Sequence, residues 1–259
     1  MKKALIIGVT SEIGVGVKRH LKEDGWQVFG TSSSDFSNEV AQLDLSDAMQ
    51  VKSFSNKVSP YRDWSLLCFF AGTMEPISPF FDTDFGGWER NLRINVLSQI
   101  EILQTLWPYR SKVEELNICF LAGGGTNSSF DNYSAYCLSK IILIKFVELI
   151  ASENKDEKFF IIGPGFINTK IHEQTIKAGK KSGTNLDKTK SFMEKPGTSI
   201  SRLYEHIKWC IAQPKEAISG RNFSTVHDPW DSNNELSSLL SQNPNVFKLR
   251  RLGFDNEAL

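Results

Sequence analysis

Short apolar runs alternate with longer amphipathic stretches along the chain. Seven runs, the last of them weaker, lie at residues 4–7, 27–29, 40–43, 66–70, 117–121, 159–162 and 222–226. Short continuous apolar runs suit strands that are buried on both faces of a parallel sheet. Segments of helix length lie between them, for example at 14–24, 47–57, 84–106 and 134–153. The alternation predicts an α/β fold, a Rossmann-like doubly wound parallel sheet of about seven strands with helices on both faces.

The length of 259 residues fits one domain, because α/β folds of about 250 residues often form a single one. Neither a repeat, a low-complexity tract nor a Pro/Gly linker divides the chain. Within it, Asp47 and Gln50 predict a helix N-cap with its reciprocal partner, and Pro108 marks the end of the third helix. We expect one domain over residues 1–230 and a polar C-terminal tail over residues 231–259.

Composition and charge exclude several classes of protein. The 30 basic and 30 acidic residues leave no basic excess, which argues against a nucleic-acid partner. The longest apolar run, 141–147, contains Lys145 and is far shorter than the roughly 20 residues of a membrane helix. The first residues lack the small-residue cleavage site of a signal peptide. Neither the four cysteines nor the four histidines have metal-ligand spacing, so we expect a cytoplasmic protein that binds no metal and no membrane.

A glycine-containing turn follows the first predicted strand. Gly8 comes directly after the strand and Gly14 lies at the start of the first helix. Backbone N–H groups and a helix N-terminus in such a turn can face a pyrophosphate, which the helix dipole attracts. Thr10 and Ser11 add hydroxyl donors. The turn therefore predicts dinucleotide binding; the alternative is a strand-to-helix turn that holds no ligand.

Further motifs follow in order along the chain. Together, over residues 3 to 230, they resemble the motifs of the short, single-domain branch of the short-chain dehydrogenase/reductase family. Residues 8–14 resemble the family's nucleotide-binding turn TGxxxGxG, with Glu12 in place of the middle glycine. The other matching segments are Asp44-Leu45 (adenine contact), FFAG at 69–72 (NNAG), WERNLRIN at 88–95 (the helix with the active-site Asn), YCLSK at 136–140 (YxxxK) and PGFINT at 164–169 (PGxxxT).

The resemblance implies an NAD(P)(H)-dependent oxidoreductase that transfers a hydride between nicotinamide and a carbonyl/alcohol substrate. Tyr136 would be its acid/base, Lys140 would hold the nicotinamide ribose, Asn95 would anchor a water in the proton relay, and Thr169 would contact the carboxamide. The implied cofactor-binding residues are Gly8, Thr10, Ser11, Ile13, Gly14, Thr31, Ser32, Ser33, Asp44, Leu45, Ala71, Gly72, Tyr136, Lys140, Pro164, Gly165, Ile167 and Thr169.

The chemistry of the catalytic pair also follows from the residues themselves. Tyr136 and Lys140 are four residues apart in a helical stretch, so both project from one face. A phenol has a pKa of about 10, which a neighbouring ammonium lowers toward the range useful for proton transfer. Without the other motifs, such a pair would be interpreted as an ordinary helix surface pair, and Asn95 as a polar residue on an inner helix face.

One expected residue is missing. The family places a Ser thirteen or fourteen residues before the Tyr, where this chain has Ala122 or Gly123. The Ser hydroxyl polarises the substrate carbonyl, and loss of such a donor can cost ~10²–10³ in rate. Thr126, Ser128, Ser129 or backbone N–H groups could replace it. The alternative function is therefore a weakly catalytic or non-catalytic cofactor-binding sensor or assembly protein.

Three further expectations concern ligands and assembly. The turn Thr31-Ser32-Ser33 has no acid before Asp35, which favours NADP(H) over NAD(H). Residues 169–197, the lid segment, hold seven lysines and would cover an anionic substrate such as a nucleotide-sugar, or else form a solvated loop. The helix at 139–150 is apolar nearly all round, and the family packs it against a second subunit, so we expect a homodimer or homotetramer.

Overall fold

A computed structural model describes residues 2–54 and 62–251 of the chain. Its seven strands form one sheet, in which every neighbouring pair runs parallel, in the order β3-β2-β1-β4-β5-β6-β7. The strands are β1 (Lys3–Ile7), β2 (Gln27–Ser32), β3 (Val40–Gln42), β4 (Leu66–Phe69), β5 (Asn117–Leu121), β6 (Lys158–Gly163) and β7 (Arg221–Ser224). All seven predicted strands and the predicted fold class are confirmed.

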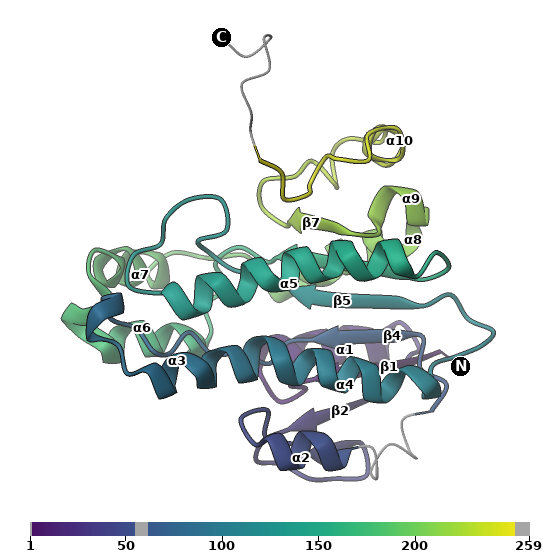
Figure 1. Ribbon diagram of the computed structural model, residues 1–259. Coiled ribbons are helices and arrows are strands. Elements are labelled where there is room, and N and C mark those ends of the chain that lie inside the picture. Colours follow the sequence, from purple (N-terminus) through teal and green to yellow (C-terminus); the bar gives the residue numbers. More distant parts are fainter. Residues whose placement is uncertain (1, 55–61, 252–259) are drawn as a thin grey trace.

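Helices cover both faces of this sheet (Figure 1). Alternate strand residues enter two separate cores, because successive side chains of a strand point to opposite faces. Leu5 and Phe120 lie in the core beneath α2 (Ala48–Ser53), α4 (Ser98–Leu106) and α5 (Ser134–Glu153). Ile6 and Cys119 lie in the core beneath α1 (Glu12–Glu23) and α8 (Ile200–Ala212).

Polar side chains set the starts of the first two helices. The Ser11 hydroxyl accepts from the Gly14 N–H at the start of α1. The Asp47 carboxylate accepts from the N–H groups of Met49 and Gln50 at the start of α2, which confirms the predicted N-cap. The Gln50 side chain reaches the Asp44 N–H and the Asp47 carboxylate. The predicted end of this helix, at residue 57, lies outside the described residues.

The predicted third helix is interrupted by a π-helical turn. The predicted helix consists of α3 (Phe85–Leu92), the π turn Arg93–Leu97 and α4. A short 3-10 helix, Phe80–Asp82, precedes it, and a 3-10 turn that contains Pro108, Trp107–Tyr109, follows it. The π turn carries Asn95. Such turns insert one extra residue and often lie at functional sites.

The lid segment is helical rather than an irregular loop. It contains the 3-10 helices Lys170–His172 and Gly179–Ser182, together with α6 (Glu173–Ala178) and α7 (Asn185–Met193). In Figure 1 the arrowheads of β5 and β7 point toward the end of the molecule where α6 and α7 lie. The lid segment therefore lies beyond the carboxyl ends of the strands, where ligands bind in open α/β sheets.

Most of the expected polar tail packs against the domain. Residues 231–251 contain α10 (Leu236–Gln242), whose Leu236 and Leu240 are buried in the same core as Phe223 of β7. The short α9 (Lys215–Ile218) precedes β7. Among the described helices, none has the length and apolar character needed to cross a membrane.

Candidate active site

A cavity of about 1500 Å³ lies along the carboxyl ends of the strands. It is lined by every cofactor-binding and catalytic residue expected from the sequence except Gly14 and Asn95, which lie just behind its wall. The structure therefore gathers segments from the N-terminal turn to the PGFINT motif around one space.

The first turn has the close backbone approach that a dinucleotide requires. Gly8 has φ +89°, and a Cβ there would lie 2.7 Å from the Ala71 backbone nitrogen. A Cβ on Gly14 would lie 2.3 Å from the Gly8 carbonyl oxygen. In the first turn of α1, the Gly14 N–H donates to the Ser11 hydroxyl, whereas no acceptor is found among the described residues for the N–H groups of Glu12 and Ile13, which can face an anion. These glycines and amides fit the pyrophosphate of a dinucleotide.

The two hydroxyls of the turn are used for structure rather than left free. The Ser11 hydroxyl donates to the Gly8 carbonyl over 2.8 Å and accepts from the Gly14 N–H over 3.0 Å. The Thr10 hydroxyl donates to the Ser32 hydroxyl over 2.8 Å. Ser11 therefore shapes the turn and lines the cavity, with its hydroxyl proton directed to the Gly8 carbonyl, and its contact with a phosphate stays a prediction.

Asp35, which comes shortly after the turn residues Thr31, Ser32 and Ser33, is hydrogen-bonded to the turn that follows β2. The Ser32 and Ser34 hydroxyls donate to the Asp35 carboxylate over 2.8 and 2.9 Å. These two hydrogen bonds lower the pKa of Asp35. Thr31, Ser32 and Ser33 line the cavity, whereas Asp35 does not.

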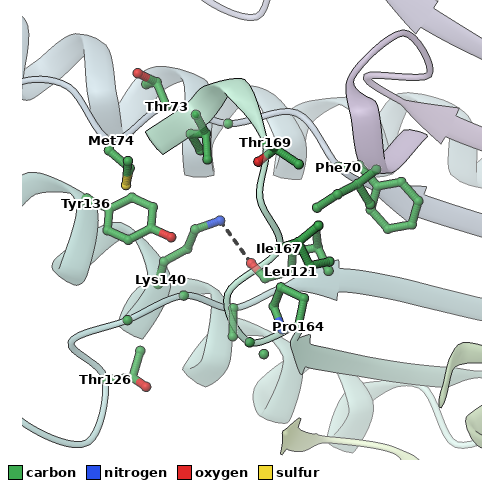
Figure 2. Close-up of a pocket in the computed structure, with 18 of the residues that line it drawn as sticks. Phe70, Thr73, Met74, Leu121, Thr126, Tyr136, Lys140, Pro164, Ile167 and Thr169 are labelled. Carbon is green, nitrogen blue, oxygen red and sulfur yellow. Dashed lines mark hydrogen bonds between the residues drawn. The ribbon is translucent and has the colours of Figure 1, made fainter. Parts of the chain in front are cut away.

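Tyr136 and Lys140 lie side by side on α5 and face the cavity (Figure 2). Tyr136 is 9% exposed, and the Lys140 ammonium donates to the Leu121 carbonyl over 2.9 Å. Burial lowers the pKa of Lys140 to about 8. Burial raises the pKa of Tyr136, and the neighbouring Cys137 raises it further by a smaller amount. The expected lowering of this pKa by Lys140 is not found. The phenol keeps its proton at neutral pH.

Asn95 connects three parts of the site. Its Oδ1 accepts from the Thr73 N–H over 2.9 Å, and its Nδ2 donates to the Thr73 carbonyl, to Asn91 and to the Ser139 hydroxyl. Ser139 immediately precedes Lys140. Asn95 therefore fixes the loop after β4 against the catalytic helix.

The structure decides between the two candidates for the missing Ser. Ala122 is buried in the core beneath α4 and α5. A Cβ on Gly123, in contrast, would lie 2.1 Å from the Tyr136 hydroxyl oxygen. Gly123 is therefore the residue that faces the catalytic hydroxyl. Thr126 and Ser128 line the cavity and Ser129 does not.

Sequence reasoning missed the residues that hold the lid segment in place. The Gln174 side chain accepts from the Met74 N–H over 2.7 Å, and the Tyr133 hydroxyl bonds to the Thr175 hydroxyl over 2.8 Å. The Glu12 carboxylate accepts from the Lys170 N–H over 2.7 Å. These contacts join residues that are 42 to 158 positions apart, so no local sequence pattern predicts them. The one available signal for any of them was Glu12, which stands where the family has a glycine.

Comparison with known families agrees with this geometry. The family model described as short chain dehydrogenase matches residues 2–179. The benzil reductase ((S)-benzoin forming) of Bacillus cereus is 23% identical over 212 residues, which cover 73% of this chain and 84% of that enzyme. A benzil reductase ((S)-benzoin forming) of Saccharomyces cerevisiae is 25% identical over 194 residues, covering 66% of this chain and 74% of that one.

Solved structures share the fold at lower identity. A short chain dehydrogenase/reductase of Saccharomyces cerevisiae superposes with a TM-score of 0.75 at 19% identity, over 89% of this chain and 98% of that one. A short chain dehydrogenase of Shigella flexneri 2a, complexed with NADP, has a TM-score of 0.71 at 15% identity, over 86% of this chain and 96% of that one.

Proposed function

Because the chain belongs to the short chain dehydrogenase family, which makes it an NAD(P)-dependent oxidoreductase, we propose that it reduces a carbonyl compound with NADPH and that Tyr136 supplies the proton. The observation that carries the proposal is the Tyr136/Lys140 pair, which faces the same cavity as the glycine turn. The relatives named benzil reductase support the carbonyl as the reacting group.

Each residue of the pair has a separate task. A bound nicotinamide cofactor supplies the hydride. Tyr136 donates its hydroxyl proton to the carbonyl oxygen as charge develops there, and the raised pKa keeps that proton available. Lys140 is fixed by the Leu121 carbonyl, and its remaining ammonium protons hold the ribose hydroxyls. Because the phenol is protonated at neutral pH, Tyr136 starts in the state that carbonyl reduction requires.

We propose NADPH as the preferred cofactor. The cavity wall at the end of β2 consists of hydroxyl groups and backbone, which do not repel a 2′-phosphate. Asp35 is the nearby acid, and its carboxylate is directed to Ser32 and Ser34. Calorimetric titration should give tighter binding of NADPH than of NADH, and Asp35→Asn should widen the difference. Equal or reversed affinities in the unaltered protein would contradict this choice.

The walls of the cavity near Tyr136 favour an aromatic substrate. Met74, Phe130, Phe166 and Phe192 line it, and the His172 ring stacks on Phe166 with centroids 4.1 Å apart. Of the seven lid-segment lysines, Lys170 and Lys188 line the cavity. We therefore propose a ketone or diketone with aromatic substituents, and an anionic group on it would be placed near Lys188.

We also propose that the protein forms a homodimer or homotetramer through α5. Leu138, Ile142 and Leu149 of this helix are 43%, 40% and 51% exposed. They lie on one side of α5, opposite Leu143 and Val147, which are fully buried. A second subunit would remove this apolar strip from water. Light scattering after size exclusion gives the molar mass, and a monomer would contradict the proposal.

The deciding experiment is the Tyr136→Phe variant. A screen of aromatic ketones, benzil among them, against NADPH oxidation should first give a substrate. The variant should then lose turnover while its NADPH affinity stays within about 2-fold, because only the proton-donating hydroxyl is removed. Full turnover in the variant would overturn the mechanism. If the wild-type protein binds NADPH but turns over no carbonyl compound, the alternative of a cofactor-binding sensor is favoured.

A further inference from the structure

The site lacks the Ser hydroxyl that would be a second hydrogen-bond donor to the substrate carbonyl, and the place next to Tyr136 has no room for it. The Tyr136 hydroxyl fills the space next to Gly123 that a side chain there would need. The donor must therefore come from another element. Figure 2 shows the Thr126 hydroxyl pointing away from Tyr136, and Ser128 is an exposed residue farther along the same loop.

Gln174 of α6 also lines the cavity, and it is hydrogen-bonded to the loop after β4. Its Oε1 accepts from the Met74 N–H over 2.7 Å and from the Thr73 hydroxyl over 3.3 Å. Two donors on one atom identify it as the oxygen of the amide, so the NH₂ group is the other branch. Met74 packs with Tyr136 in one apolar cluster, and Figure 2 shows its sulfur beside the Tyr136 ring. The amide of Gln174 is thus attached to the loop that contacts the catalytic ring.

The NH₂ group of Gln174 is available. Within residues 2–54 and 62–251, no acceptor is found for it, although Gln174 lines the cavity. The anchoring is firm, since Asn95 and Asn91 bond to the backbone of Thr73. A side-chain amide fixed at its oxygen presents its N–H groups without reorganisation, which is the property that makes a donor effective toward developing negative charge.

We propose that Gln174 donates a side-chain N–H to the substrate carbonyl oxygen, in the role that a Ser hydroxyl has in relatives. The hydrogen bond strengthens as the hydride adds and the oxygen becomes negative, and Tyr136 then supplies the proton. No bond of Gln174 forms or breaks. Since α6 belongs to the lid segment, the second donor is present only when this segment lies over the cavity. This proposal rests on the proposed carbonyl reduction.

The test compares Gln174→Glu and Gln174→Leu with Lys177→Gln, an exposed residue of the same helix that does not line the cavity. The probes are benzil and other aromatic ketones, with NADPH. The Glu side chain keeps the acceptor for the Met74 N–H but removes both amide donors. We expect kcat to fall ~10²–10³-fold in both Gln174 variants, with KM and NADPH affinity within about 3-fold. Lys177→Gln should match wild type.

A second readout separates donation from packing. As pH falls from 8 to 5, the carboxyl group introduced by Gln174→Glu gains a proton and can donate again. The ratio of its kcat to that of wild type should then rise at least 10-fold, whereas the Gln174→Leu ratio should stay constant. The ratio is used because Lys140 and His172 titrate in both proteins.

The outcomes distinguish this inference from the proposed function. Wild-type turnover that Tyr136→Phe abolishes and both Gln174 variants retain would overturn the role of Gln174 alone. A rise in KM with unchanged kcat in the Gln174 variants would also overturn it. So would a ratio of the Gln174→Glu kcat to the wild-type kcat that does not change with pH. A wild-type protein that reduces none of the ketones would overturn the proposed function and this inference together.

Discussion

Two adjacent small residues directly after β5 should differ in their response to substitution by Ser. A Cβ on Gly123 meets the hydroxyl, Cζ and Cε1 atoms of Tyr136 at 2.1, 2.7 and 3.0 Å. Gly123→Ser must therefore displace the catalytic ring, and a displacement of about 1 Å can cost ~10²-fold in rate. We expect kcat to fall by at least that factor, although the substitution adds the hydroxyl that relatives have.

Ala122→Ser is the matched control. Ala122 is buried in the core beneath α4 and α5 and also lines the cavity, but it is the side-chain position of Gly123 that meets the Tyr136 hydroxyl. We expect kcat within about 3-fold of wild type and a lower Tm, because a buried hydroxyl without a partner costs about 1–3 kcal/mol. A tenfold gain in kcat from either substitution would show that the site lacks a second donor and can accept one at β5.

The charge state of Lys140 sets a pH limit on activity. Burial lowers its pKa to about 8, so the ammonium is present at pH 7 and is lost as pH rises through 8. The neutral amine holds ribose hydroxyls less strongly. We expect kcat/KM for NADPH to fall about 10-fold per pH unit above 8, as measured at saturating ketone from pH 6 to 10. A flat profile between pH 7 and 9.5 would contradict the role of the charge.

At the scale of elements, predictions succeeded where the signal was local. The seven apolar runs gave all seven strands, because burial on both faces requires continuous apolar sequence. The polar extension of β2 through Thr31 and Ser32 could not be predicted, since it depends on pairing with β3 at Ala41 and Gln42. The π turn at Asn95 is set by bonds to Thr73 and Ser139, neither of which is near in sequence.

The same reasoning explains what was missed at the site. Most of the motif residues line the cavity, because the motifs at residues 8–14, 44–45, 69–72 and 164–169 all lie at the carboxyl ends of strands, which meet at one edge of the sheet. The anchors of the lid segment are single hydrogen bonds between distant residues and leave no periodic signal. Burial, rather than the neighbouring charge, controls the pKa of Tyr136, and the depth of a side chain is not contained in an i,i+4 spacing.

Glu12 connects two elements, the nucleotide turn and the lid segment. Its carboxylate accepts from the Lys170 N–H, and Glu12→Ala removes that bond. We expect trypsin to cleave at the lysines of the lid segment about 3- to 10-fold faster in the variant, since a hydrogen bond of ~0.5–1.5 kcal/mol no longer holds it. Glu12→Gln keeps an oxygen acceptor and should be cleaved at nearly the wild-type rate. Equal rates in Glu12→Ala and wild type would rule out this contact as a restraint.

At the scale of the whole molecule, the C-terminal residues complete the sheet. β7 lies at its edge, and unpaired strand edges promote association. The Asn222 N–H donates to the Phe247 carbonyl over 2.8 Å, and the Ser224 N–H donates to Asp228 over 2.7 Å. The chain thus covers the edge of β7 with its own later residues.

Arg221 holds this cover in place, so removing the cover should affect the entire fold. The guanidinium is buried and donates to the carbonyls of Leu240, Asn243 and Val246. A chain that ends at Gln242 loses two of these acceptors and the bond to the β7 edge, leaving a buried cation that is only partly satisfied. We expect a Tm lower by several degrees because the cation loses acceptors, and concentration-dependent aggregation in light scattering because the edge of β7 becomes accessible to other chains. Arg250→Ala is the control: it removes the partly exposed ion pair with Glu148 and the hydrogen bonds to Asn245 and the Leu249 carbonyl, but leaves the cover of β7 in place. Its Tm should stay within about 2 °C of wild type. A truncated chain as stable and as monodisperse as the Arg250→Ala variant would show that β7 is protected without residues 243–259.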